Sequence, residues 1–116
     1  MQISIKSTNI SLTDAVNSFI NSKFAKLSKV AKKYVPEDVV FAVEVGKESK
    51  HHGKGDVFFA EGHIVWGRNE IYEHLTGNDL YGAIEALARE VTRKFISKKE
   101  KLSDKARKGA RKTKSD

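Results

Sequence analysis

Arginine side chains recur at helical spacing towards the C-terminal end of the chain. Arg89 and Arg93 stand four residues apart, almost opposite the apolar positions of the same stretch. Residues four apart are neighbours on one face of a helix. The guanidinium group is planar and always charged, which suits it to phosphate oxygens. We therefore predict a helix over residues 79–101 whose exposed face can follow a phosphate backbone. The last turns of this helix add Lys98, Lys99 and Lys101.

A second set of cations lies closer to the N-terminus. Lys26, Lys29 and Lys33 recur at spacings of three and four within residues 13–34. The same stretch has apolar residues at helical spacing and a good helix N-cap at Thr13, so it also predicts an amphipathic helix. Two helices that bury their apolar stripes side by side would present both cationic stripes together. The apolar positions are Val16, Phe19 or Ile20, Phe24, Leu27, and Val30 or Ala31.

The net charge agrees with this pattern. The chain has 22 Lys and Arg against 15 Asp and Glu, a formal charge of +7. An excess of this kind favours a polyanionic partner, by attraction and by release of counterions. A charged surface that serves only solubility is the alternative, so the placement of the cations matters more than their number.

The sequence gives little support for a metal site. Cysteine is absent, which excludes disulfides, thiolate nucleophiles and cysteine-rich zinc sites. Adjacent histidines in a loop seldom chelate a metal as a pair, and we expect no metal and no cofactor. A basic loop contact is the better reading of the first two histidines. The four histidines are His51, His52, His63 and His74.

Catalysis is not supported either. Glu44 and Glu61 are predicted on neighbouring strands, where they could face each other as a carboxylate pair. Exposed strand positions commonly carry glutamate, and the chain has neither a glycine-rich phosphate loop nor a nucleophile elbow. We therefore expect a protein that is not an enzyme and has no small-molecule substrate. Trp66, next to a predicted turn, and Tyr81 are expected to pack on the fold rather than to stack on bases.

The chain has the length of one domain. No apolar run is long enough to span a bilayer, and the N-terminus lacks the pattern of a signal peptide. We therefore expect a cytoplasmic protein without a membrane partner.

Hydrophobic periodicity predicts an α+β fold of order β-α-β-β-β-α, with two helices packed on one face of a four-stranded sheet. Val43 and Val45 should face the helices, as should Ala60 and Ile64, while Glu61 and His63 face outward. The first helix should be a right-handed crossover between parallel strands. The predicted elements are strand 1–6, helix 13–34, strands 39–45, 57–65 and 71–75, and helix 79–101.

The last residues differ in composition from the rest of the chain. Residues 103–116 have no hydrophobic period and hold six cations against two acids. The sequence therefore predicts a folded domain over residues 1–102 and a basic, disordered tail over residues 103–116.

The final helix carries a pattern that resembles a known family. Residues 79–95, DLYGAIEALAREVTRKF, resemble the signature helix of the ribosome hibernation-promoting factor family, also called the ribosome-associated inhibitor or sigma-54 modulation family. Residues 3–9 (ISIKSTN) look like its first strand, and residues 51–61 (HHGKGDVFFAE) look like its loop and third strand. Thr13, Lys23, Lys26 and Lys29 resemble its first helix. The resemblance covers about residues 1–102 and is closest to the short forms.

The resemblance implies a non-enzymatic protein that binds ribosomal RNA at the decoding centre of the small ribosomal subunit. Such a protein blocks messenger and transfer RNA and silences translation under stress. Basic residues of both helices would contact the RNA, which adds Lys23 and Lys94 to the cations above. The family often carries cations where this chain has Ile96 and Ser97.

Two other functions are open to such a sequence. A generic double-stranded RNA-binding module also packs helices on a small sheet, but it places its RNA-binding lysines at the start of the last helix. Here that helix starts with Asp79, and its cations come late. A protein-binding regulator of transcription is the second alternative, and it would not need two aligned cationic stripes.

Overall fold

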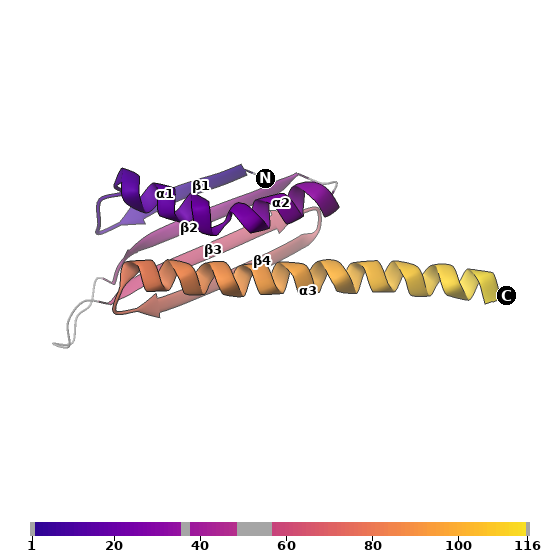
Figure 1. Cartoon of the computed structure of the whole chain (residues 1–116). Coiled ribbons are helices and arrows are strands. Elements are labelled where there is room, and N and C mark those ends of the chain that lie inside the picture. The colour runs from indigo at the N-terminus through magenta and orange to yellow at the C-terminus, as the bar shows by residue number, and fades with distance from the viewer. Residues whose placement is uncertain (1, 36–37, 49–56, 116) are drawn as a thin grey trace.

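The computed structural model describes residues 2–35, 38–48 and 57–115, with side chains described as far as residue 98. A four-stranded sheet is covered by helices on one side (Figure 1). The α+β architecture predicted from the sequence is therefore confirmed. The elements are β1 (Gln2–Thr8), α1 (Asp14–Lys23), α2 (Ala25–Tyr34), β2 (Val39–Lys47), β3 (Phe58–Trp66), β4 (Asn69–Gly77) and α3 (Leu80–Ser115).

The strands lie in the order β1-β2-β3-β4. β1 and β2 are parallel, with Ile3 beside Phe41, and the other two pairs are antiparallel. Because parallel neighbours need a long connection, α1 and α2 together form the crossover. The β2-β3-β4 meander then leads into α3, so all helices return to the same face.

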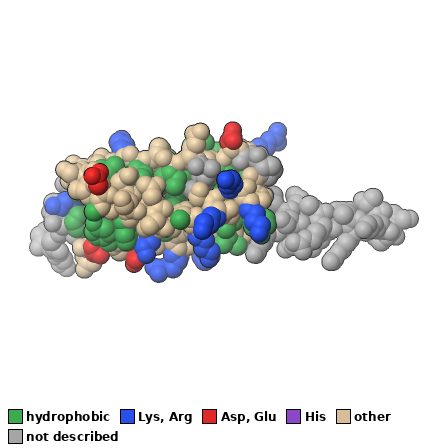
Figure 2. Space-filling model, turned by 45° about the horizontal axis from the view of Figure 1, so that its top comes forward, with side chains coloured by type: hydrophobic (Ala, Val, Ile, Leu, Met, Phe, Trp, Pro, Cys, Tyr) green, Lys and Arg blue, Asp and Glu red, His purple; other side chains and the backbone are tan. Residues whose placement is uncertain are grey.

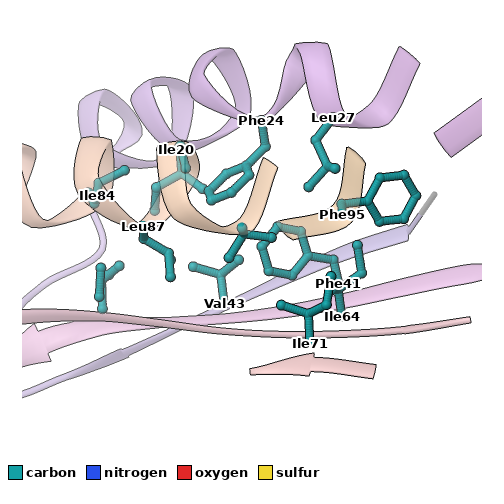
Figure 3. Packing of buried hydrophobic residues seen from close by; sticks show 14 of the residues in the cluster. Ile20, Phe24, Leu27, Phe41, Val43, Ile64, Ile71, Ile84, Leu87 and Phe95 are labelled. Atoms are coloured by element: carbon teal, nitrogen blue, oxygen red, sulfur yellow. The ribbon is translucent and has the colours of Figure 1, made fainter. Parts of the chain in front are cut away.

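The core lies between this face of the sheet and the helices. Val43 and Val45 are buried, as are Ala60 and Ile64, which confirms the predicted inner faces of β2 and β3. Alternation along each strand sends every second side chain into this layer. In Figure 3, Ile20, Phe24 and Leu27 point down onto Phe41 and its neighbours, while Phe95 closes one end. The buried cluster comprises Val16, Ile20, Phe24, Leu27, Ala31, Val39, Phe41, Val43, Val45, Ala60, Ile64, Trp66, Ile71, Ala83, Ile84, Leu87, Ala88, Val91 and Phe95.

The first helical stretch differs from the continuous helix predicted over residues 13–34. Thr13 caps its start by accepting a hydrogen bond from the Val16 amide at 3.1 Å, as expected. At Phe24, however, the backbone leaves helical geometry (φ −98°, ψ 7°), and two helices result. The Phe24 ring is fully buried edge-on to Phe41, with centroids 4.7 Å apart. No proline or glycine marks the break, which lies at this buried contact and just after Ser22, whose hydroxyl donates to the Phe19 carbonyl at 2.8 Å, a type of bond that often bends helices.

The last helix is longer than predicted. The backbone of α3 continues to Ser115, through the segment for which the sequence predicts a disordered tail. The division of the chain at residue 102 stays a prediction. Among the described residues, no helix combines the length and apolar character needed to cross a membrane.

Gly46 is required where β1 approaches β2. A Cβ atom at this position would lie 2.3 Å from the Thr8 carbonyl oxygen and 2.9 Å from the Phe59 ring. We expect Gly46→Ala to lower the free energy of unfolding by about 1–3 kcal/mol, because a backbone atom must move to relieve the overlap. Urea unfolding measures the change. Gly77→Ala is the matched control, since its Cβ would meet its nearest atom at 3.7 Å, and an equal loss in both variants would contradict the steric explanation.

Candidate nucleic-acid interface

A groove lies between the crossover helices and α3. Lys23 of α1 and Lys26 of α2 line one side, and Arg89 and Arg93 of α3 line the other, around a volume of about 520 Å³. We call this site the cationic groove, defined by these four residues. Figure 2 shows the blue Lys and Arg side chains that gather on this side of the molecule. Of the two predicted cationic stripes, Lys26 from one and both arginines of the other therefore meet at the groove.

The sequence pattern accounts for this placement. In α3, Leu87 and Val91 are fully buried against the sheet, and Arg89 is exposed on the far side of the helix. In α2, Leu27 is fully buried, and the neighbouring Lys26 is exposed. Successive residues in a helix are rotated by about 100°, so an apolar stripe on the sheet leaves the cations at the outer surface.

Two acidic residues moderate the charge of the groove. Glu85 of α3 forms an ion pair with Lys23 at 2.9 Å, and Glu90 forms one with Arg93 at 2.9 Å. The Lys23 and Glu85 side chains are 37% and 52% exposed, so their pair contributes at most about 1 kcal/mol to stability. Lys23 also lies 5.2 Å above the centroid of the Phe19 ring, and these contacts together hold its ammonium at the groove.

The other predicted cations lie outside the groove. Lys29 and Lys33 are exposed on α2, and Lys33 lies 5.2 Å from the centroid of the Tyr34 ring. Lys94 pairs with Glu73 on β4, and Lys98 donates to the Glu70 carbonyl at 3.2 Å. Lys94 and Lys98 therefore connect α3 to the edge of the sheet, on the flank of α3 away from α2. The side chains of Lys99 and Lys101 lie outside the described residues.

The uncharged part of the groove was not predicted from the sequence. Ala88, Thr92 and Ile96 line it between the two rows of cations. These residues recur every four positions beside Arg89 and Arg93, and that spacing was the signal available in the sequence. Ile96, where the resemblance leads one to expect a cation, thus gives the groove an apolar patch. The RNA-binding roles expected for the lysines and arginines stay predictions.

Both aromatic residues singled out from the sequence pack on the fold. Trp66 is buried, and its ring lies 4.7 Å from that of Phe95. Tyr81 packs edge-on to Phe19 at 4.7 Å, although 40% of it remains exposed. The expectation that they pack rather than offer stacking platforms is consistent with these contacts.

Polar residues on the face of the sheet turned away from the helices form a hydrogen-bonded network. Glu44 and Glu61 are register partners on β2 and β3, as the sequence suggested. The Tyr72 hydroxyl donates to Glu61, and Nδ1 of His74 lies 3.2 Å from the same carboxylate oxygen. The Tyr72 hydrogen bond lowers the pKa of Glu61, with a smaller contribution from His74, while desolvation opposes it. The same bond raises the pKa of Tyr72.

We expect the free energy of unfolding of Tyr72→Phe to fall less than that of the wild type as the solution is made acidic. Because the pKa of Glu61 is lowered in the folded state, its carboxylate stabilises the fold fully at pH values above the pKa of an unfolded glutamate, about 4.3. This contribution is lost as the pH falls through the lower, folded-state pKa. The difference in unfolding free energy between wild type and variant should therefore shrink between about pH 6 and about pH 3. Urea titrations at both pH values measure it, and Tyr81→Phe, which removes a hydroxyl elsewhere, should show no such trend.

The carboxylates and histidines do not form a metal site in the described part of the chain. No group of three potential metal ligands occurs there. His63 instead lies 2.8 Å from Glu70 through Nε2, and His74 contacts Glu61 and Glu48. His51 and His52 lie outside the described residues.

Solved structures share this fold. The Protein Y N-terminal domain of Thermus thermophilus superposes with a TM-score of 0.65 at 20% sequence identity, covering 81% of this chain and 94% of that one. A structure described as a ribosomal subunit interface protein from Coxiella burnetii gives a TM-score of 0.69 at 9% identity, covering 86% and 99%. At these identities the similarity establishes the fold alone.

Sequence relatives extend the likeness beyond the fold. The ribosome hibernation promoting factor of Escherichia coli (strain K12) is 30% identical over 102 residues, which cover 88% of this chain and 97% of that protein. Its counterpart in Salmonella typhimurium is 31% identical with the same coverage. Neither name describes an enzyme. A family model described as "Sigma 54 modulation protein / S30EA ribosomal protein" matches residues 3–103. The chain therefore belongs to the Sigma 54 modulation protein / S30EA ribosomal protein family.

Proposed function

We propose that this protein is a ribosome hibernation factor that binds the small ribosomal subunit through its cationic groove. The observation that carries the proposal is the convergence of Lys23, Lys26, Arg89 and Arg93 from three helices on one groove. The names of the relatives, ribosome hibernation promoting factors, indicate the ribosome as the polyanion.

The groove suits a folded RNA backbone better than a base sequence. A-form grooves hide base edges from side chains, so recognition of folded RNA depends on phosphates and shape. Arg89 and Arg93 lie one helical turn apart and are exposed, so both guanidinium groups can reach neighbouring phosphates. Exposed Lys29 and Lys33 on α2 extend the positive surface beyond the groove.

The proposed mechanism is steric. The folded domain occupies the decoding channel of the subunit, and the helices hold it there through ribosomal RNA. Messenger and transfer RNA are then excluded, and translation stops under stress without any covalent step. The protein acts in the cytoplasm, together with the ribosomes, and needs no cofactor.

Sedimentation with purified ribosomes through sucrose gradients at low and high salt tests the proposal. We expect comigration with the small subunit that weakens as salt rises, because phosphate contacts release counterions. Prior loading of the subunit with messenger and transfer RNA should prevent binding. Absence from every ribosomal peak, together with retention on free duplex RNA, would instead identify a generic RNA-binding module. A chain truncated after Leu102 shows in the same run whether residues 103–116 contribute.

A further inference from the structure

The face of the sheet turned away from the helices is uncovered in the described part of the chain. We call it the outer sheet face, and it differs from the cationic groove in both charge and polarity. Val40 is 50% exposed and Tyr72 is 56% exposed on this face, although both are large hydrophobic side chains. The rest of the face is formed by Gln2, Ser4, Lys6, Thr8, Ala42, Glu44, Gly46, Phe59, Glu61, His63, Val65, Glu70, His74 and Thr76.

A hollow of about 400 Å³ lies near the centre of the outer sheet face. It arises because one row across the sheet begins with two small side chains, Ser4 on β1 beside Ala42 on β2. The same row continues with His63 on β3 and Tyr72 on β4, whose rings stand higher. The hollow therefore has a low floor, one aromatic wall, and Glu44 and Glu61 along its border.

The charges around the hollow favour a cationic occupant. Glu44 and Glu61 lie directly opposite each other, an arrangement that is unfavourable for like charges. Hydrogen bonds keep both carboxylates in place, since Thr8 donates to Glu44 at 2.8 Å and Tyr72 donates to Glu61. Lys6 is the only cation that lines the hollow within the described residues. In a chain with a net charge of +7, the acidic border of this face stands out, and RNA phosphates would be repelled from it.

We propose that the outer sheet face docks an extended, arginine-rich segment of a protein partner. A guanidinium group placed in the hollow can pair with Glu44 and Glu61 and lie against the ring of Tyr72. Alternate residues of an extended segment lie about 7 Å apart and point to the same side, so neighbouring arginines can follow the face along the strands. Val40 and Val65 offer apolar contact for the arginine stems. This inference is independent of the proposed function, because the surface lies across the sheet from the cationic groove.

Fluorescence anisotropy with a labelled peptide of alternating arginine and threonine tests the proposal on the full chain at low salt. Glu44→Gln/Glu61→Gln removes both carboxylates and keeps their shape, and it should weaken binding about tenfold. Glu85→Gln/Glu90→Gln is the matched control, since it removes the same charge from the helical side and should leave the affinity nearly unchanged. Ala42→Gln fills the hollow without changing the charge, and it should also weaken binding even if the first double variant folds poorly.

Three results would overturn the proposal. Equal affinities for the two double variants would mean that the peptide responds only to net charge. Unchanged affinity in Ala42→Gln would show that the hollow is not used. An equal loss of peptide affinity in Arg89→Ala/Arg93→Ala would show that peptide binding is not confined to the outer sheet face. A loss of peptide affinity confined to the outer-face variants supports a binding surface separate from the cationic groove.

Discussion

Arg89→Ala/Arg93→Ala should keep the fold and lose most of the affinity for the small ribosomal subunit. Both side chains are exposed and line the cationic groove, so their removal creates no cavity. Two charge-assisted contacts to phosphate together account for about a 100-fold change in affinity. The logarithmic dependence of affinity on salt should also become shallower by between about one and two units, because fewer counterions are released. Sedimentation at several salt concentrations measures both quantities.

The control for this variant must remove the same charge elsewhere. Arg68 in the turn between β3 and β4 and Lys6 on the outer sheet face are both exposed and outside the groove. Arg68→Ala/Lys6→Ala therefore lowers the net charge by the same amount. If both double variants lost the same affinity, long-range attraction rather than the groove would explain binding. If Arg89→Ala/Arg93→Ala kept the wild-type salt dependence, α3 would not face the RNA.

Phe95→Ala should be the most destabilising of the substitutions considered. Phe95 is fully buried, and its ring packs 4.7 Å from the ring of Trp66 on β3. Removal of a buried phenyl ring costs about 3–5 kcal/mol, through lost transfer free energy and the cavity that remains. This is a large part of the 5–15 kcal/mol that a domain of ordinary stability possesses. Urea unfolding followed by circular dichroism measures the loss.

Phe19→Ala offers the comparison for Phe95→Ala. Phe19 is a partly buried residue at the margin of the core, packed edge-on to Tyr81. Its truncation removes the same atoms but leaves a site that water can enter, so a smaller loss is expected. A loss for Phe95→Ala no greater than that for Phe19→Ala would show that the end of the core near Trp66 is loosely packed.

Periodicity was sufficient to predict the architecture and the buried faces. The alternation through Val43 and Val45 placed β2 correctly, and the choice of Ala60 and Ile64 for the inner face of β3 was right. Such patterns are local consequences of burial on one side. The adjacent Phe58 and Phe59 were ambiguous, because both are apolar. Phe59 lies on the outer sheet face, stacked on His74 with centroids 5.4 Å apart, a contact between residues distant in sequence.

The candidate site could be predicted only in part, for a geometric reason. Arg89 and Lys94 lie on the same short helix segment, but their directions differ because each residue turns the helix by about 100°. Arg89 lines the cationic groove, whereas Lys94 reaches Glu73 on β4. Which flank of α3 meets β4 depends on the rotation of the helix about its axis when it packs on the sheet. The break at Phe24 also lies at a contact between residues distant in sequence, since the Phe24 ring packs edge-on to that of Phe41.

The parallel pairing of β1 and β2 has a consequence for how the chain acquires this fold. β2, β3 and β4 join through neighbours in sequence, whereas Gln2 must find Val40 across the whole crossover. Closing a long loop costs entropy before any pairing compensates for it, so contacts distant in sequence slow folding. We therefore expect the meander and α3 to assemble first and β1 to join last. In a chain that emerges from the ribosome N-terminus first, the first strand made is thus the last to be placed.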